Sequence, residues 1–130
     1  DANAVEQVRD ISNGGVDYAV DLAGTIPAMN TAYAITRYGG SVVTAGLSPS
    51  TAEFSFNQGD LVSQEKSIRG SYMGSCVPVR DIPRFISLYK QGRLPVDSLV
   101  DGHIGFDEVN AGFDKLQDVK TVRQILAPHG

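Results

Sequence analysis

Three short apolar runs in a fixed order constrain the fold of this chain most. They occupy residues 16–22, 41–47 and 67–74, and the first two end in turns that contain glycine. A segment with the apolar spacing of a helix separates the first run from the second. Parallel strands joined by helices have this order, and the carboxyl ends of such strands face a bound ligand. We therefore predict an α/β fold with a parallel sheet whose strand ends form a binding site.

The composition is that of an ordinary folded domain. Hydrophobic residues make up 42% and charged residues 20% of the 130 residues, enough for a real core. The net charge is −4 and no basic patch is visible, which argues against nucleic acid as a partner. No apolar run reaches the roughly 18 residues of a membrane span. The only cysteine, Cys76, rules out an internal disulfide, so we expect a reducing, cytoplasmic location.

Local signals predict further elements along the chain. Asn13 and the two glycines after it end a first helix, Pro27 lies near the start of a second, and Gly39 and Gly40 end that second helix. Asp81 is a plausible N-cap of a later helix and Asp107 of the last. The predicted helices are at residues 4–11, 27–38, 59–64, 82–89 and 107–116, and the predicted strands at 16–22, 41–45, 53–56, 67–73, 99–104 and 121–126.

Five strings carry a resemblance to a known family. They are Gly-Val-Asp-Tyr with Leu-Ala-Gly in residues 15–24, Gly-Gly with Ala-Gly-Leu in 39–47, Arg-Gly-Ser-Tyr-Met-Gly at 69–74, Asp-Glu-Val-Asn-Ala-Gly-Phe-Asp at 107–114, and Thr-Val-Arg-Gln-Ile-Leu at 121–126. In this order the chain resembles the C-terminal part of the zinc-containing, medium-chain alcohol dehydrogenases. The resemblance implies the second half of a doubly wound Rossmann sheet in residues 1–92. It also implies an α+β segment in residues 93–130 that returns toward a catalytic domain.

The resemblance also implies which residues bind the cofactor, NAD or NADP. Three strand ends and one arginine are involved. They are Leu22, Ala23 and Gly24 on the adenosine and ribose side, Ala45, Gly46 and Leu47 at the nicotinamide carboxamide, Ser71, Tyr72 and Met73 as the next edge of the same site, and Arg123 at the pyrophosphate. Leu47 and Tyr72 would also wall the alcohol pocket. Independently, glycine lets a ligand approach the backbone closely, and a guanidinium offers a pyrophosphate a planar fork of donors.

Several parts of a complete enzyme are missing from the sequence. It has no Gly-x-Gly-x-x-Gly loop, and no acidic residue about 20 positions after such a loop. One cysteine and two histidines cannot supply a catalytic zinc site, nor a four-cysteine structural one. The chain begins at Asp1 rather than at a methionine, so we expect a fragment that starts inside the nucleotide-binding domain. On this interpretation the parent moves a hydride between an alcohol and NAD with the help of zinc, and the 130 residues alone hold no catalytic or metal site and are inactive.

Some polar side chains have a functional and a structural interpretation. Asp17 and Asp21 alternate along one predicted strand and could pair for acid–base chemistry, but Asp21 near the strand end is more typical of a turn hydrogen bond. Arg123 could pair with a surface acid. Cys76 is more typical of a small, partly buried apolar residue than of a reactive thiol, and His103 of a structural residue than of a ligand.

The runs at residues 53–56 and 67–73 predict an interface. The resemblance places them at the sheet edge, paired with the same strands of a second subunit in a homodimer or tetramer. The alternative is an edge strand protected by Lys66 and Arg69. Two alternatives for function also stay open: a zinc-free reductase of the quinone oxidoreductase type, and a non-catalytic, dimeric α/β binding module.

Overall fold

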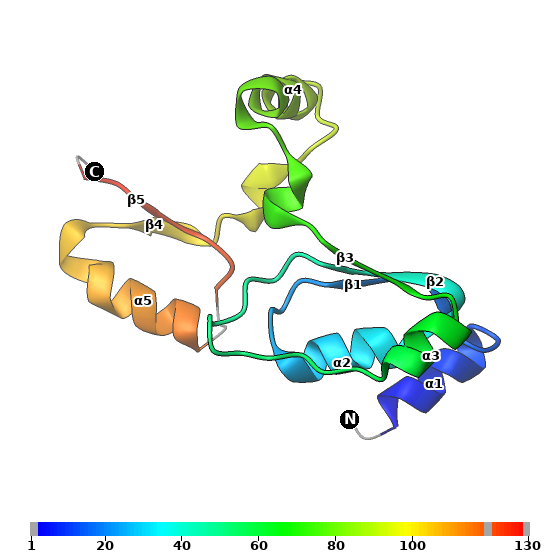
Figure 1. Ribbon diagram of the computed structural model, residues 1–130. Helices are drawn as coiled ribbons and strands as arrows, with labels where there is room; N and C mark the ends of the chain where they lie inside the picture. Colours follow the sequence, from blue (N-terminus) through cyan, green and yellow to red (C-terminus); the bar gives the residue numbers. More distant parts are fainter. Residues whose placement is uncertain (1–2, 119–120, 129–130) are drawn as a thin grey trace. The chain divides into compact units, whose positions relative to one another are not determined.

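The structure is a computed structural model that describes residues 3–118 and 121–128 (Figure 1). It divides into two compact units, Asp1–Cys76 and Val77–Gly130. Helices alternate with parallel strands, so the predicted α/β class with a Rossmann-like parallel sheet is confirmed. The division after Cys76 places the helix that follows it in the second unit; the assignment of residues 1–92 to a nucleotide-binding domain stays a prediction.

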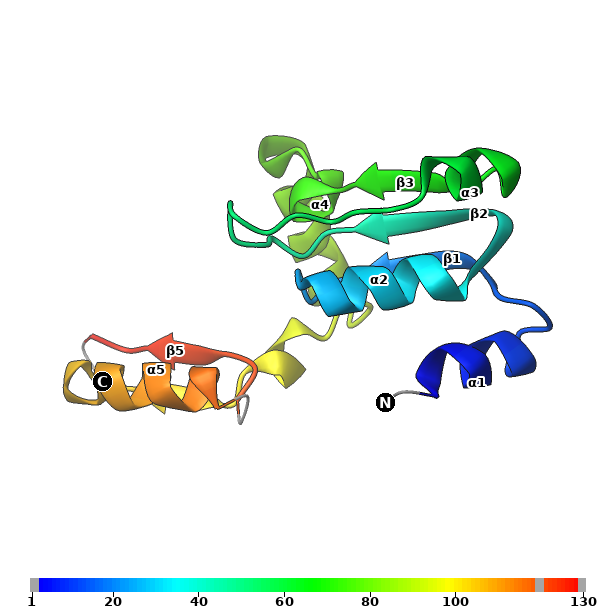
Figure 2. The same cartoon turned by 60° about the horizontal axis from the view of Figure 1, so that its bottom comes forward.

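The first unit contains one parallel sheet of three strands. Its elements are α1 (Ala4–Ile11), β1 (Val16–Asp21), α2 (Ile26–Ile35), β2 (Thr36–Thr44), α3 (Gln58–Ser63), β3 (Ser67–Gly70) and a 3₁₀ turn (Tyr72–Ser75). The strand order is β1-β2-β3, with Ala19 paired to Val42 and Val42 to Ile68 (Figure 2). Because all three strands run in one direction, their carboxyl ends lie at one edge of the sheet.

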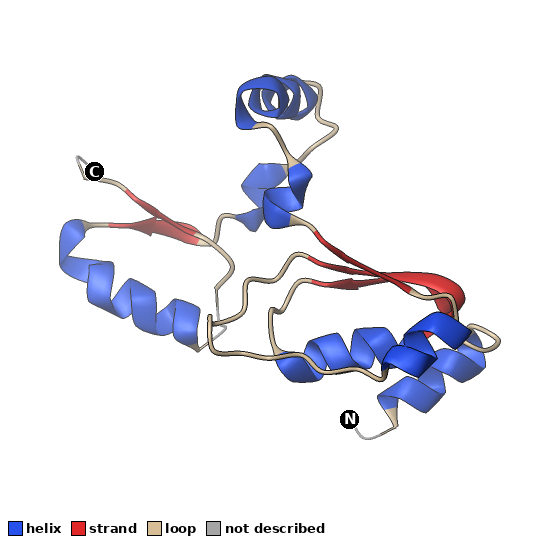
Figure 3. Ribbon diagram, viewed as in Figure 1, coloured by secondary structure: helices blue, strands red, loops and turns tan. Residues whose placement is uncertain are grey.

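Helices α1, α2 and α3 lie on one side of this sheet (Figure 3). The core is formed by Ala19 and Val42 from the strands and by Met29 and Ala32 from α2, all of them buried. Side chains alternate along a strand, so Tyr18 of β1 points to the other face, where it is 73% exposed. Within the described part of the first unit, no helix covers that face.

Helix α2 begins where the sequence indicates but ends earlier. The Thr25 hydroxyl accepts a hydrogen bond from the Ala28 N–H at 3.4 Å, as an N-cap does. The helix ends at Ile35 instead of at the glycine pair, because Thr36 turns into β2 and its hydroxyl donates to the Ala32 carbonyl at 2.7 Å. Gly39 and Gly40 therefore lie inside β2, where the pairing with β1 is irregular.

The predicted strand at residues 53–56 is wrong. This segment has no regular secondary structure. Phe54 and Phe56 instead pack together and against Tyr33, with ring centroids 5.8 to 6.3 Å apart. The alternation of the two phenylalanines thus reflects ring packing onto α2, not pairing in a sheet. Tyr33 itself is partly buried and packs against the core.

The third strand is shorter than predicted. β3 ends at Gly70, and the following residues form the 3₁₀ turn Tyr72–Ser75. Met73, Gly74 and Ser75 have φ values of 49°, 67° and 55°. These left-handed conformations cannot continue a strand.

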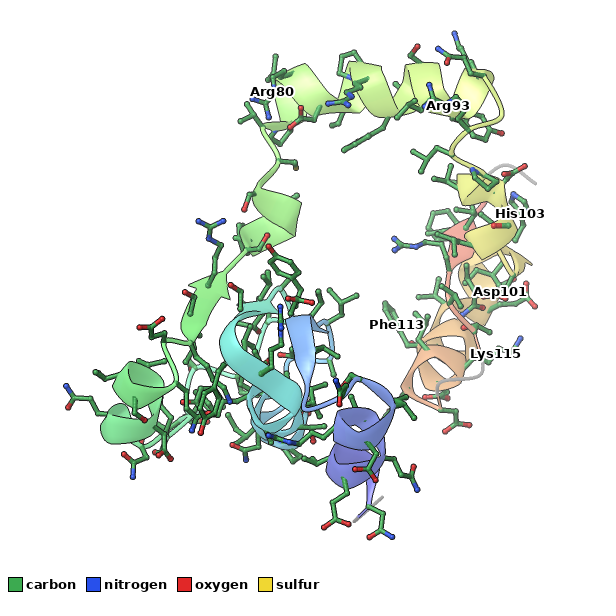
Figure 4. All side chains as sticks on the ribbon, turned by 90° about the vertical axis from the view of Figure 1, so that its right-hand side faces the viewer. Arg80, Arg93, Asp101, His103, Phe113 and Lys115 are labelled. Carbon is green, nitrogen blue, oxygen red and sulfur yellow. The ribbon has the colours of Figure 1, made fainter. Side chains whose placement is uncertain are left out.

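The second unit contains the remaining elements. They are α4 (Pro78–Lys90), a 3₁₀ turn (Val96–Leu99), β4 (Gly102–Ile104), a 3₁₀ turn (Phe106–Glu108), α5 (Val109–Gln117) and β5 (Gln124–Leu126). β4 and β5 form a parallel pair, each shorter than the strand predicted there. Figure 4 shows Arg80 near the start of α4 and Arg93 just beyond its end.

Two predicted N-caps in this unit are wrong by a few residues. Asp81 lies in the first turn of α4, where its carboxylate reaches back to accept from the N–H of Val77, the actual N-cap, at 2.8 Å. Asp107 lies inside the 3₁₀ turn, and Glu108 makes the corresponding bond to the N–H of Gly105 at 3.1 Å. In both places an acidic side chain satisfies a backbone donor at the helix start from within the first turn. For Glu108, at the third position after Gly105, this bond is the second half of a capping box.

Candidate functional site

The carboxyl ends of β1 and β2 are joined by one buried carboxylate. Asp21 is 5% exposed. Its Oδ1 accepts hydrogen bonds from the N–H groups of Ala23 and Gly24, at 3.0 and 3.3 Å. Its Oδ2 accepts from the hydroxyl of Thr44, at 2.9 Å. The turn-forming role predicted for Asp21 is therefore confirmed, and the bond to Thr44 adds a link to the neighbouring strand.

The main chain of Asp21 links the same two strand ends a second time. Its carbonyl accepts from the N–H groups of Ala45 and Gly46, at 2.8 and 3.2 Å. Those two donors are therefore occupied. No hydrogen bond to the carbonyl of Ala45 or Gly46 is found among the described residues. Ala45 and Gly46 thus present backbone acceptors, not donors, to anything that binds there.

Two glycines allow the loops after β1 and β2 to touch. A Cβ on Gly46 would lie 2.0 Å from the Gly24 nitrogen, and one on Gly24 would lie 2.8 Å from the Gly46 carbonyl carbon. Gly24 also has a φ of +64°, and its carbonyl accepts from the Ser48 hydroxyl at 2.8 Å. From the sequence, we expect these glycines to allow the close approach of a ligand. The structure shows that they are required for the approach of one loop to the other.

The ends of β2 and β3 form an open depression of about 380 Å³. It is lined by Thr44, Ala45, Gly46, Leu47, Gly70, Ser71 and Tyr72. The Ser71 N–H donates to the Thr44 carbonyl at 2.8 Å and so ties the two strand ends together. The side chains of Leu47 and Tyr72 are 83% and 74% exposed at its border. The structure therefore brings together five of the residues predicted from the second and third runs.

The remaining predicted residues of the first unit lie outside this depression. Leu22 and Ala23 line a second one, of about 310 Å³, between the end of β1 and α2. Gly24 is buried between the loops, and Met73 is exposed in the 3₁₀ turn. Asp21 lines the second depression and Thr44 the first, so their hydrogen bond connects the two.

Arg123 belongs to the second unit and is exposed there. Asp101 accepts from the N–H of Arg123 at 3.0 Å and from that of Val122, and its own N–H donates to the Arg123 carbonyl at 2.8 Å. The two bonds to its carboxylate hold the pKa of Asp101 below its ordinary value. No ion pair of the Arg123 guanidinium occurs among the described residues.

The described residues do not form a metal site. Nowhere among them do three or more His, Cys, Asp or Glu side chains gather closely enough to hold an ion. Cys76 is a free, half-buried thiol, and His103 is exposed on β4 (Figure 4). Of the helices that the structure describes, none combines the length and the apolar character needed to cross a bilayer.

Comparisons with known proteins agree with one another. The sequence profile described as zinc-binding dehydrogenase matches residues 1–91. A Mycobacterium tuberculosis protein with the provisional name alcohol dehydrogenase D is 36% identical over 129 residues, which are 96% of this chain and 35% of that protein. Alcohol dehydrogenase 1 of Cenchrus americanus is 30% identical over 122 residues, 93% of this chain and 32% of that protein.

Solved structures show the same pattern. The chain superposes on benzyl alcohol dehydrogenase from Acinetobacter calcoaceticus with a TM-score of 0.84 and 28% identity, covering 94% of this chain and 33% of that one. An alcohol dehydrogenase zinc-binding domain protein from Burkholderia ambifaria gives a TM-score of 0.85 at 28% identity, over 98% and 34% of the two chains. The chain therefore spans about a third of the length of the relatives that it matches.

Proposed function

The chain belongs to the zinc-binding dehydrogenase family, and from that premise we propose that it forms the cofactor-binding C-terminal part of an alcohol dehydrogenase. The complete protein would transfer a hydride between an alcohol or aldehyde and NAD or NADP. The observation that carries this proposal is the depression at the ends of β2 and β3, where backbone acceptors meet two exposed apolar side chains.

The depression has the features that a nicotinamide ring needs. When bound, the nicotinamide supplies the ring carbon that accepts or gives up the hydride. Its carboxamide carries two N–H donors, and the free carbonyls of Ala45 and Gly46 are suitable acceptors for them. Leu47 and Tyr72 at the border would exclude water from the ring and form part of the alcohol pocket.

For the other predicted residues we propose separate roles toward the cofactor. Leu22, Ala23 and Gly24 would border the adenosine and ribose side, where Leu22 and Ala23 line the second depression. The exposed guanidinium of Arg123 would bind the pyrophosphate, since its planar donors match phosphate oxygens. Neither role requires a proton transfer, so this chain would bind and orient the cofactor without a catalytic side chain of its own.

We assign no zinc ligand to this chain. Its described residues offer no ligand group for the ion, so any zinc in the parent protein would be held by residues outside the described ranges. We accordingly expect the 130 residues alone to be inactive toward alcohols. We also propose a cytoplasmic location.

We also propose that β3 pairs with a second copy of the chain. Of the two runs predicted at the edge, only Ser67–Gly70 is a strand. Lys66 does not protect it, because this side chain is buried and its Nζ donates to the Tyr33 carbonyl at 3.1 Å. Replacing Ile68 by proline would remove an N–H from β3 and should convert dimers to monomers in sedimentation experiments. A homodimer that survives this change would contradict the interface.

Cofactor binding tests the main proposal. In the complete protein, the fluorescence of bound NADH or NADPH gives a Kd, and Tyr72→Ala should raise it by about threefold to tenfold through loss of apolar contact. Tyr38→Ala is the matched control, because Tyr38 is as exposed as Tyr72 but lies near the opposite end of β2. Absence of binding of either nucleotide by the unaltered protein would refute the proposal.

A further inference from the structure

The five hydrogen bonds that converge on Asp21 exceed what one turn requires. Three reach its carboxylate and two its carbonyl, from Ala23, Gly24 and Thr44 and from Ala45 and Gly46. We propose that Asp21 is a positioning residue for the cofactor, which holds the loops after β1 and β2 in the single arrangement that lets their two depressions bind one molecule. This inference rests on the proposed function.

Because Asp21 is buried, the loss of any of these hydrogen bonds is costly. Because Asp21 is almost completely buried, water cannot easily replace a lost partner, and an unpaired buried polar group costs the full price of its desolvation. No ion pair of Asp21 occurs among the described residues. Its negative charge is therefore balanced by the two N–H groups and the hydroxyl, and the loops cannot shift without uncovering the carboxylate.

Thr44 is the link between the two depressions. Its hydroxyl reaches Oδ2 of Asp21, while its carbonyl accepts from the Ser71 N–H at the end of β3. The three strand ends that we expect to contact the cofactor are thus connected through two residues. Removing the Asp21 carboxylate should also shift Ala45 and Gly46. Their N–H groups donate to the carbonyl of Asp21, although they form no hydrogen bond with its carboxylate.

Asp17 provides a matched comparison on the same strand. It lies four residues before Asp21, an even spacing, so the two side chains point to the same face of β1. Its carboxylate is exposed and forms an ion pair with Arg37. Exposed ion pairs contribute little. A change at Asp17 therefore removes a carboxylate from this strand without disturbing either loop.

The experiment measures cofactor binding and steady-state kinetics in the complete protein for four variants. Asp21→Ala should raise the Kd for NADH by about tenfold or more, since it removes three hydrogen bonds. Asp21→Asn should restore binding to within about threefold of the unaltered protein, because its oxygen still accepts from Ala23 and Gly24 and its NH₂ can donate to Thr44. Thr44→Val should raise the Kd by roughly threefold, and Asp17→Ala should leave it unchanged.

The kinetic constants separate positioning from general damage. We expect the KM for NAD to rise in Asp21→Ala and Thr44→Val while the KM for the alcohol changes much less. A merely structural role would instead reduce the amount of folded enzyme, which lowers kcat for all substrates and leaves both KM values unchanged. Rescue by asparagine gives a second sign of positioning.

Each other outcome has a defined meaning. A folded Asp21→Ala variant with the Kd of the unaltered protein would overturn the inference and leave the proposed function intact. If Asp21→Ala does not fold, Thr44→Val decides, and an unchanged Kd in that variant would overturn it. If the unaltered protein binds neither NADH nor NADPH, the proposed function fails and this inference with it.

Discussion

Two almost completely buried aspartates, one in each unit, are satisfied in opposite ways. Asp21 is 5% and Asp81 8% exposed. Asp21 binds partners on two strands, including Thr44, which is 23 positions away. Asp81 binds the N–H of Val77 and, through two bonds of 2.7 and 2.8 Å, the guanidinium of its neighbour Arg80. Burial alone therefore does not indicate function: the first carboxylate joins separate parts of a candidate site, and the second fixes the start of one helix.

The largest expected effect breaks the contact between the loops after β1 and β2. Gly46→Ala would place a Cβ 2.0 Å from the backbone nitrogen of Gly24, so the loops must separate. We expect a loss of about 3 kcal/mol in the free energy of unfolding and a loss of measurable NADH binding. Chemical denaturation and fluorescence titration would measure the two. Gly102→Ala is the control, because a Cβ there meets nothing within 4 Å; a Gly46→Ala protein that binds NADH normally would contradict the loop contact.

A smaller effect, on stability alone, is expected for the carboxylate of Asp81. The hydrogen bonds from Arg80 and then from the Val77 N–H lower the pKa of Asp81 from 3.8 to about 2. Because the folded protein binds this proton more weakly than the unfolded one, the stabilisation is complete above pH 3.8 and is lost as the pH falls toward 2. Asp81→Asn should therefore lower the Tm by a few degrees at pH 5 and by much less near pH 2.

Binding measurements on the same variant sharpen the comparison with Asp21. Asp81→Asn should leave the Kd for NADH unchanged, because its partners are all within four residues of it. Asp107→Asn, a change at an exposed carboxylate of the same unit, controls for the loss of charge. A clear rise of the Kd in Asp81→Asn alone would show that the two aspartates do not differ in the way we describe.

The same contrast explains how far the sequence predicts this molecule. Signals that act over a few residues were sufficient for Pro27 near the start of α2, for the start of β1 at Val16 and for the turn formed by Asp21. They were not sufficient for the start of β2, which begins at Thr36 and not at Ser41. Contacts between distant residues were not predicted. Nothing near Asp21 in the sequence indicates Thr44, and no local pattern distinguishes a glycine that admits a ligand from one that admits a second loop.

The error at residues 53–56 has the same origin. An alternation of two phenylalanines is compatible with a half-buried strand, and only the position of Tyr33 in space shows that the rings complete a cluster. The helix ends were misplaced for a related reason. Asp81 and Asp107 carry the residue type of an N-cap, but the chain enters each helix elsewhere. The family resemblance, which uses the order of the strings over the whole chain, was therefore more informative than any single string.

The smallest effect is expected at the amino end of the same sheet, at Lys66. Its Nζ donates to the Tyr33 carbonyl and lies 4.6 Å from the centre of the Tyr33 ring. Burial first, and then the charge of Arg9, lower the pKa of Lys66. The unfolded chain therefore holds this proton more strongly than the folded protein, so folding becomes more favourable as the pH rises through the lowered pKa toward 10.5.

Lys66→Met should remove this pH dependence. We expect the Tm of the unaltered protein, relative to that of the variant, to rise by about 2 °C between pH 8 and 10.5, with no change in the Kd for NADH. Tyr33, whose own pKa is raised by burial, is present in both proteins and so cancels in the comparison. Arg37→Met is the control, because that side chain is exposed and lies on the same sheet. If Lys66→Met weakened cofactor binding as much as Asp21→Ala, the carboxyl ends of the strands would not be the only part of the sheet that positions the cofactor, and the role we assign to Asp21 would lose its specificity.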